Sequence, residues 1–331
     1  MITMTSNIIK KFSKKLFDGN FIIENIKGDA SKRKYYRASS GGKSLIIMDS
    51  SRERRNFINF LKFSDIFPCN NIKIPKIIKK DLNNNILALE DFGDNLIIKR
   101  SSSKNFFEIY EKSIINIIKI QKVRNKKISF YSDEKYFKES SLFIEWVLEI
   151  FFSFDITNKD KNKIKKEVIK LIDNLSLKRN FLVHRDYHSK NIFYKNKGII
   201  IIDYQDAVYG SPLYDLVSLV NDCYKDINDN NRKKLLNFFR ENFNNFSKNN
   251  LSKDELVHNF YLLSVQRHMK ASGIFCRLSK KNNRNDYLKY LKRTFNYIIT
   301  ASSNYDNLKT INFFAKEAIY NLNESNNSCG R

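Results

Sequence analysis

The sequence predicts an α+β protein in which a small antiparallel sheet with one helix precedes a mainly helical part. Two observations predict this class. Over the first ~95 residues, short β-prone runs alternate with Gly, Ser and Asn turns. From Ser103 onward, apolar residues recur every three or four positions, which is the helical period. We therefore expect one division of the chain, between residues 1–95 and 96–331.

The first part contains the expected strands. The stretch "FIIENIKGDASKRKYYRASSGGKSLIIMDS" (21–50) predicts antiparallel strands joined by tight loops. A helical pattern at 56–65 and two strands within 70–95 follow. The motif "GGKS" (41–44) ends like a phosphate-binding loop but lacks that loop's first glycine, so we expect a hairpin turn there.

The second part is predicted to be helical except at 181–215. Helical periodicity occurs at 106–121, 139–153, 158–177, 231–247, 253–278 and 284–301. The polar end "ESNNSCGR" predicts a frayed tail.

The composition favours a cytoplasmic protein without a specific nucleic-acid or membrane partner. The formal net charge is +25, but lysines are spread along the chain, as in "KDKNKIKKEVIKLIDNLSLKRN" (159–180), which indicates compositional bias. The four cysteines include no C-x-x-C pair, so neither zinc nor a disulfide framework is indicated. No apolar stretch has the length of a signal peptide or a membrane span. We expect a monomer, although nothing in the sequence determines the oligomeric state.

The densest polar cluster is "FLVHRDYHSKNIFY" (181–194). His184, Asp186 and Asn191 fit the pattern H-R-D-x-x-x-x-N, and Asp203 ends the next strand after a turn at "KNKG". Asp186 can accept the proton of an attacking hydroxyl, while Asn191 and Asp203 offer oxygen ligands to Mg²⁺. Alone, Asp186 could cap a turn and His184 could be a core histidine. The agreement of four positions favours a nucleotide-phosphate site.

Further segments carry a more particular resemblance. "HRDYHSKNIF", "DYQDAVYG" and "QRHMKASGIF" resemble the aminoglycoside phosphotransferase and choline kinase family, and most closely the bacterial anomeric kinases of cell-wall recycling. That group phosphorylates the C1 hydroxyl of N-acetylmuramate and N-acetylglucosamine with ATP. His188 stands where protein kinases usually carry lysine, and no Ala-Pro-Glu segment is present, so protein substrates are disfavoured.

The resemblance implies a bilobal protein-kinase-like fold, with a nucleotide-binding lobe at 1–95 that ends in the hinge and a helical lobe at 96–331 that holds the catalytic loop and sugar site. ATP and Mg²⁺ are the implied cofactors. Asp186 matches the catalytic base, Asn191 and Asp203 the metal ligands, and His184 and Asp215 structural positions; Asp215 could hold the catalytic loop or simply be a helix N-cap. The implied nucleotide-binding residues are Ser31, Arg33, Arg37, Leu89, Glu90 and Asp91, and the implied substrate-binding residues are Glu145, Trp146, His188, Gln205, Asp206, Arg267 and His268.

Three groups of residues leave alternatives open. Met48 occupies the place of the usual strand lysine, and Arg33 or Arg37 could supply the charge for the phosphates instead or could simply face solvent. Glu145 and Trp146 form either a sugar platform or part of the core. Arg267 and His268 belong either to a solvated helix face or to the acceptor site, where they could contact the lactyl carboxylate of muramate.

Other functions remain open at this point. The chain could phosphorylate another small hydroxylated substrate of the aminoglycoside or choline type, although its basic balance favours an anionic or neutral acceptor. It could be a nucleotide-binding sensor that has lost catalysis, which Met48 would favour and the intact Asp186, Asn191 and Asp203 disfavour. A nucleic-acid-binding module would require clustered basic residues and stacking aromatics on one face.

Overall fold

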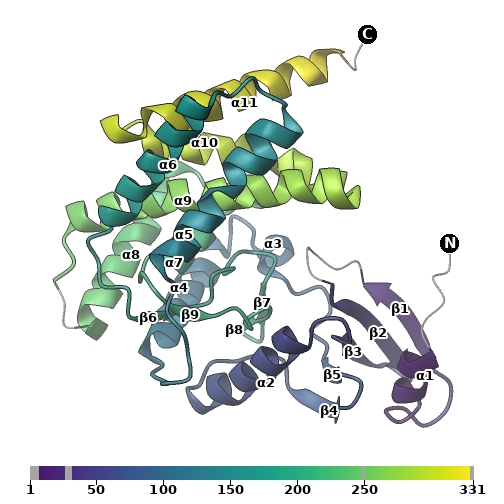
Figure 1. Ribbon diagram of the computed structural model, residues 1–331. Helices are drawn as coiled ribbons and strands as arrows, with labels where there is room; N and C mark the ends of the chain where they lie inside the picture. The colour runs from purple at the N-terminus through teal and green to yellow at the C-terminus, as the bar shows by residue number, and fades with distance from the viewer. Residues whose placement is uncertain (1–6, 27–31, 248–249, 329–331) are drawn as a thin grey trace. The chain divides into compact units, whose positions relative to one another are not determined.

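The computed structural model describes residues 7–26, 32–247 and 250–328 (Figure 1). The chain divides into two compact units, which are described separately. The N-terminal unit comprises Met1–Lys112 and Lys190–Ala207, and the C-terminal unit comprises Ser113–Ser189 and Val208–Arg331. A division into lobes at residue 95 stays a prediction.

The N-terminal unit is built on a five-stranded antiparallel sheet with the order β1-β2-β3-β5-β4. Its strands are β1 (Ile22–Ile26), β2 (Lys34–Ser40), β3 (Lys43–Asp49), β4 (Ile77–Asp81) and β5 (Ile86–Glu90). Gly41 and Gly42, with φ of 54° and 78°, form the turn between β2 and β3. Because a tight hairpin turn favours two residues with positive φ, glycine suits both positions. The predicted hairpin at "GGKS" is confirmed.

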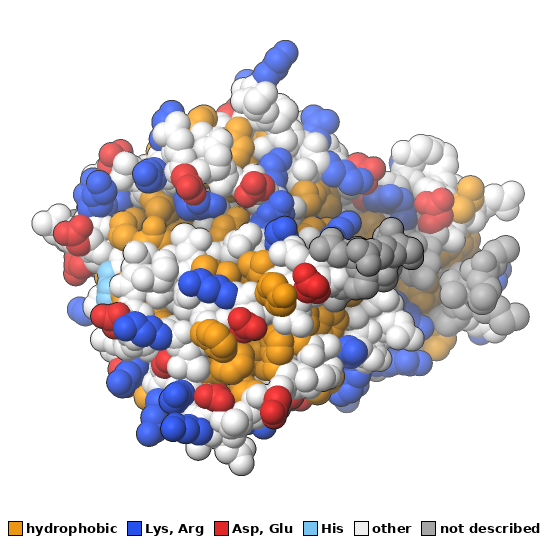
Figure 2. All heavy atoms as spheres, turned by 90° about the horizontal axis from the view of Figure 1, so that it is seen from above, with side chains coloured by type: hydrophobic (Ala, Val, Ile, Leu, Met, Phe, Trp, Pro, Cys, Tyr) orange, Lys and Arg blue, Asp and Glu red, His pale blue; other side chains and the backbone are white. Residues whose placement is uncertain are grey.

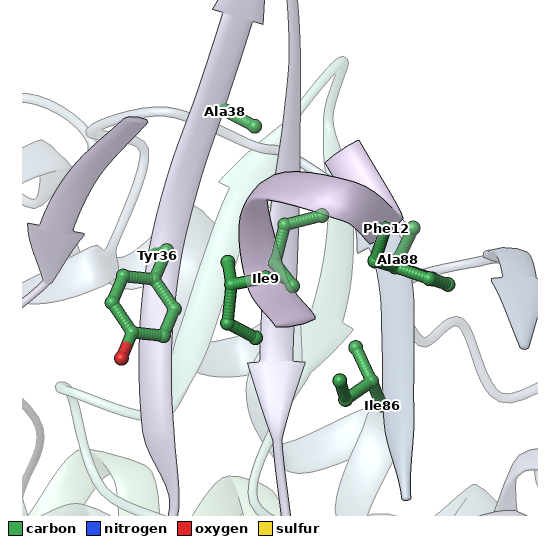
Figure 3. Close-up of a cluster of buried hydrophobic side chains, with 7 residues drawn as sticks. Ile9, Phe12, Tyr36, Ala38, Ile86 and Ala88 are labelled. Atoms are coloured by element: carbon green, nitrogen blue, oxygen red, sulfur yellow. The ribbon is translucent and has the colours of Figure 1, made fainter. Parts of the chain in front are cut away.

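A short helix that the sequence analysis missed covers one side of this sheet. Helix α1 (Asn7–Ser13) places Ile9 and Phe12 against strand side chains that include Tyr36, Ala38 and Ile86 (Figure 3). Ile9 and Ala38 are fully buried. Removing this apolar surface from water stabilises the sheet by roughly 25 cal/mol per Å².

The N-terminal unit also contains the predicted helix and hairpin. Helix α2 (Arg54–Cys69) buries Phe57, Phe60, Phe63 and Phe67, which recur at helical spacing. A one-turn helix, α3 (Ile97–Arg100), follows the sheet. Strands β7 (Ile192–Lys195) and β8 (Gly198–Ile201) pair as a hairpin through Asn196 and Lys197, both with positive φ. The predicted turn at "KNKG" is thereby confirmed.

The C-terminal unit is mainly helical, as predicted. Helix α4 (Phe106–Lys122) crosses the boundary between the units in the sequence. The other elements are α5 (Asp133–Ser140), the π-helix η1 (Phe143–Phe151), α6 (Asn158–Asp173), α7 (Tyr214–Val220), α8 (Asp229–Ser247), α9 (Lys253–Asn282), the 3₁₀-helices η2 (Asn285–Tyr290) and η3 (Asp306–Leu308), α10 (Leu291–Ser302) and α11 (Lys309–Ser328). Strands β6 (Phe181–Val183) and β9 (Val208–Gly210) form a separate antiparallel pair. Helix α11 extends to Ser328, so most of the tail expected to fray is helical.

Helix α9 is the centre of the C-terminal unit. It begins with a capping box between Ser252 and Glu255 and packs against α10, η1, α5 and α7. A Cβ atom at Gly273 would lie 2.5 Å from the carbonyl oxygen of Leu142, so only glycine permits this close approach. Residues around most of the helix are buried, so it has no single apolar side.

Charged side chains are dispersed over the face shown in Figure 2, where Lys and Arg lie among carboxylates and uncharged side chains. This distribution agrees with compositional bias as the origin of the basic charge. Among the described residues, no helix is both long and apolar enough to span a bilayer.

Candidate functional site

The predicted catalytic and metal-binding residues fall into two clusters, one in each unit. The cluster in the N-terminal unit surrounds Asp203, which directly follows the β7–β8 hairpin and has a φ of 63°. Arg33 Nη2 lies 2.7 Å from Asp203 Oδ1, and Arg33 Nη1 donates to Gln205 Oε1 over 2.9 Å. Gln205 Nε2 donates to Asp203 and also to Asp206. Residues far apart in sequence thus form one polar network.

The same hairpin brings the two predicted metal ligands to one end. Ile192 pairs with Ile201, and the backbone N–H of Ile202 donates to the carbonyl oxygen of Asn191 over 3.0 Å. Arg33 and Gln205 both donate to Oδ1 of Asp203, and no hydrogen bond from a described residue reaches its Oδ2. A carboxylate oxygen and an amide oxygen are the hard ligands that Mg²⁺ prefers, so these residues fit the metal.

Across the described ranges, no group of three or more His, Cys, Asp or Glu could hold a metal ion. A magnesium ion at Asn191 and Asp203 would therefore take its other ligands from water and phosphate, which is how Mg²⁺ is usually held in nucleotide sites.

Arg33 and Arg37, the two candidates to replace the strand lysine, differ in burial and in their partners. Met48 is completely buried, and Arg33 is only 6% exposed. Arg33 Nε lies 3.7 Å from Glu53 Oε2. Burial lowers the pKa of Arg33, but the opposing effect of Tyr35, Asp203 and Glu53 is larger, and the net pKa is raised. The guanidinium is therefore a permanent buried cation beside Asp203.

Arg37 has a different partner. Its Nε donates to Asp91 Oδ2 over 2.6 Å, and the backbone N–H of Gly93 donates to Asp91 Oδ1 over 2.8 Å. Burial acts to raise the pKa of Asp91, but its bonds with Arg37 and Gly93 have the larger, opposite effect. The net pKa is lowered, so the carboxylate stays ionised. Arg37 thus braces the end of β5, where the predicted hinge residues Leu89, Glu90 and Asp91 lie. Ser31 lies outside the described residues.

Helix α2 contacts the polar network around Asp203 at two places. Glu53 is its N-cap residue, and Tyr204, one residue after Asp203, packs on the rings of Phe60 and Phe67 at centroid distances of 4.8 and 5.5 Å. The hydroxyls of Tyr204 and Ser64 are 2.9 Å apart. A shift of α2 would therefore move the Glu53 carboxylate beside Arg33 and the side chains that hold Tyr204, the residue after Asp203.

The cluster in the C-terminal unit surrounds Asp186. Lys270 Nζ, on α9, lies 3.7 Å from Asp186 Oδ1 and 3.6 Å from Glu139 Oε2. Glu139, on α5, also accepts from Arg185 and from the hydroxyl of Tyr131. The Asp186 side chain is 35% exposed and the Lys270 side chain only 10%. A buried cation therefore supports a carboxylate that remains accessible.

The charges of this cluster keep Asp186 ionised. Burial acts to raise the pKa of Asp186, but Lys270, Arg185, His188 and Arg267 outweigh it and lower the pKa well below its usual range. Burial acts to lower the pKa of Lys270, but Asp186 and Glu139 raise it overall. At neutral pH the pair is thus a carboxylate and an ammonium ion. An ionised carboxylate is the form that can accept a proton.

Buried aspartates hold the backbone of the loop that carries Asp186. Asp215 accepts from the backbone N–H groups of His184 and Arg185 over 2.7 and 2.9 Å, and Asp222 accepts from that of Ser189 over 2.8 Å. Arg185 has a φ of 78°, so these bonds stabilise a conformation that is unfavourable for a side chain larger than glycine. Asp215 lies in the first turn of α7 and Leu213 is the N-cap, so the N-cap alternative is wrong.

The remaining predicted structural and substrate residues are mostly buried. His184 Nδ1 lies 3.3 Å from the backbone nitrogen of Asp186. His188 packs edge-on against Tyr224. Arg267 donates to Ser218 Oγ, and His268 Nε2 lies 2.8 Å from the carbonyl oxygen of Asn221. Burial lowers the pKa of His268 to about 3, so this ring is neutral.

Trp146 and Glu145 lie on η1 but differ in exposure. Trp146 is 9% exposed and lies under the ammonium group of Lys281, at 5.5 Å from the ring centroid, whereas Glu145 is exposed. The burial of Trp146 favours the core alternative for that position, whereas the solvated-face alternative is wrong for Arg267 and His268, which are 6% and 0% exposed.

Sequence reasoning missed Glu139, Arg185, Asp222 and Lys270. Arg185 and Lys270 lie inside the quoted "HRD" and "QRHMK" segments, next to residues that were selected. Glu139 and Asp222 have no local signal, because only the fold brings them to the loop.

Comparisons with known proteins agree with this geometry. The model of the phosphotransferase enzyme family matches residues 22–244. An N-acetylmuramate/N-acetylglucosamine kinase of Pseudomonas aeruginosa is 27% identical over 281 residues, covering 82% of this chain and 81% of that protein. The enzyme of the same name from Neisseria meningitidis is 26% identical and covers 85% of each chain.

Solved structures share the fold. The gentamicin complex of the aminoglycoside phosphotransferase APH(2″)-IIa has a TM-score of 0.62 at 12% identity, with 89% of this chain and 97% of that chain covered. The choline kinase LicA of Streptococcus pneumoniae has a TM-score of 0.60 at 15% identity, with 87% and 97% covered. These neighbours have the bilobal kinase-like fold that the sequence predicts. Because the family model spans most of the chain, the chain belongs to the phosphotransferase enzyme family.

Proposed function

We propose that this protein is an ATP-dependent kinase that phosphorylates the anomeric hydroxyl of N-acetylmuramate, N-acetylglucosamine or both, in the cytoplasmic recycling of peptidoglycan. The observation that carries the proposal is the half-exposed Asp186, held ionised by Lys270 on a loop that Asp215 fixes. The names of the relatives from Pseudomonas and Neisseria support the choice of acceptor.

In the proposed reaction, the anomeric oxygen attacks the γ-phosphorus and the bond from that phosphorus to the β,γ-bridging oxygen breaks. Asp186 orients the hydroxyl and takes its proton, so the products are the sugar 1-phosphate and ADP. Asn191 and Asp203 would hold Mg²⁺, which would supply positive charge to the phosphates when bound. Phosphoryl transfer needs little covalent work from the protein, so positioning and electrostatics provide most of the catalysis.

The N-terminal unit would bind the nucleotide. We assign to Arg33 the role of the missing strand lysine, since it is buried, cationic and next to Asp203. The backbone at Leu89–Asp91 would meet adenine, and Arg37 would brace this segment through Asp91. Gln205 and Asp206 belong to the same polar network and are the acceptor contacts that we propose for this unit.

Phosphorus NMR tests the proposal directly. Purified protein is incubated with ATP and Mg²⁺ and with N-acetylmuramate, N-acetylglucosamine, glucose or choline, and Asp186→Asn serves as the control. A sugar 1-phosphate signal that requires Asp186 is the expected result. Phosphocholine as the main product would move the acceptor to the amino alcohols, and tight ATP binding without any product would favour a sensing protein.

A further inference from the structure

The C-terminal unit contains an open hollow of about 510 Å³ between α5, the start of η1 and α9. Four cationic side chains line it, and only two carboxylates do so; the charged residues are Glu134, Lys135, Lys138, Glu139, Lys270 and Arg277. Leu142 and Ile274 supply an apolar wall. A cavity of this size with a few convergent charges suits a small polar ligand.

The charges of the hollow are not balanced within the protein. Glu139 is already bonded to Arg185 and Tyr131 and lies near Lys270. Lys138 and Arg277, in contrast, form no ion pair with any carboxylate that the structure describes. Two cations at the side of a concave site therefore remain for an anionic ligand.

The hollow adjoins the proposed catalytic base. Lys270 lines the hollow, and its Nζ lies 3.7 Å from Asp186 Oδ1. The ammonium group of Lys270 therefore lies between the hollow and the proposed base. A substituent of a sugar whose reacting hydroxyl lies at Asp186 could therefore enter the hollow past Lys270.

We propose that this hollow is a carboxylate subsite for the acceptor, in which Arg277 and Lys138 bind a carboxylate carried by the sugar. The inference rests on the proposed function and deepens it. Of the two proposed acceptors, only N-acetylmuramate carries a carboxylate, on its lactyl ether. A guanidinium can bind a carboxylate through two parallel hydrogen bonds, and Leu142 and Ile274 can contact the ether's methyl group.

The contacts of Arg267 argue against the alternative that it binds this carboxylate. Arg267 is 6% exposed, and its guanidinium is already bonded to Ser218 and lies 3.8 Å from the sulfur of Cys223. Arg277, ten residues further along the same helix, is half-buried and lines the hollow. The position of the charge therefore favours Arg277.

Isothermal titration calorimetry without ATP tests the subsite independently of turnover. The ligands are N-acetylmuramate and N-acetylglucosamine, and the proteins are the wild type, Lys138→Gln/Arg277→Gln, Arg277→Lys and Lys253→Gln. Lys253 is an exposed lysine at the start of the same helix, outside the hollow, and is the matched control. Losing a charge-assisted bond weakens binding by about 10- to 100-fold.

We expect the double variant to bind N-acetylmuramate at least about tenfold more weakly, with unchanged binding of N-acetylglucosamine. Arg277→Lys should retain part of the preference and Lys253→Gln all of it. Equal weakening for both sugars, no weakening, or no binding of N-acetylmuramate by the wild type would overturn the subsite. Preferential binding that depends on Arg277 together with no sugar 1-phosphate in the NMR assay would overturn the proposed function and leave the subsite standing.

Discussion

Lys270 Nζ lies 3.7 Å from Asp186 Oδ1, although the two residues are on different elements and far apart in the chain. The lysine is almost fully buried and the aspartate is half-exposed, so the pair directs a permanent positive charge at a carboxylate that can still meet a ligand. The pKa of Asp186 is consequently low and that of Lys270 high. This pair determines the pH range in which the proposed base is active.

Lys270→Met should move the acidic limb of the pH profile of kcat/KM to higher pH. Lys270 is the largest influence that lowers the pKa of Asp186, so its removal raises that pKa and the base becomes protonated at a higher pH. We also expect kcat to fall by about 10- to 100-fold. The measurement is the acceptor kinetics between pH 4 and 9.

Lys270→Arg is the control for this prediction. It keeps the charge and should leave the acidic limb close to that of the wild type. If Lys270→Met lowered kcat without any movement of the acidic limb, Lys270 would have a purely structural role.

Asp186→Asn should lower kcat by on the order of 10²- to 10⁴-fold while ATP still binds. The amide cannot accept the proton, but the nucleotide residues belong to the other unit and are unchanged. Steady-state kinetics and nucleotide titration measure the two effects separately. Full activity of this variant would exclude Asp186 as the base.

Arg33→Met should raise the KM for ATP by at least about tenfold, because the variant lacks the buried cation beside Asp203. Arg37→Met should have a smaller effect, since Arg37 braces Asp91 at the end of β5. Arg33→Lys keeps the charge but not the paired bonds to Asp203 and Gln205. Its KM for ATP should lie between those of Arg33→Met and Arg37→Met. If Arg37→Met had the larger effect, the assignments of the two arginines would be reversed.

Local patterns were sufficient for much of the fold. The hairpins at Gly41 and Asn196 follow from turn residues, and most of the long helices follow from apolar spacing. Helix α11 (Lys309–Ser328) is the exception, because no helical pattern was identified there. Helices α1 and α5 are short and were not predicted, although α5 has a local start signal in its N-cap Ser132 and the acidic Asp133 and Glu134. The π-helix η1 lies within 139–153, where the apolar pattern predicted a single helix, because periodicity alone cannot distinguish the two kinds of helix.

Local sequence patterns identify only part of the candidate site. The motif identifies Asp186, Asn191 and Asp203, whose roles stay a proposal, because their spacing is local to one loop and hairpin. Lys270 and Glu139 join Asp186 through α9 and α5, so only the tertiary structure reveals them. Arg267 and His268 were selected because they lie in the segment "QRHMKASGIF" that carries the family resemblance, but the helix that carries them is buried on most sides.

Glu139→Gln should destabilise the protein at neutral pH by about 3 kcal/mol, because Arg185 and Lys270 lose their charged partner. Burial raises the pKa of Glu139, but Lys270 and Arg185 lower it overall, below its ordinary value of 4.5. A carboxylate whose folded-state pKa is lowered stabilises the fold above its ordinary pKa, and this contribution disappears as the pH falls through the folded-state value. The difference between wild type and variant should therefore be constant from pH 8 to 6 and shrink below about pH 4.5. Urea unfolding across this range measures it, with Glu134→Gln, an exposed carboxylate on the same helix, as the matched control. A gap between wild type and Glu139→Gln that stayed constant down to pH 3 would mean that the charge of Glu139 does not stabilise the fold.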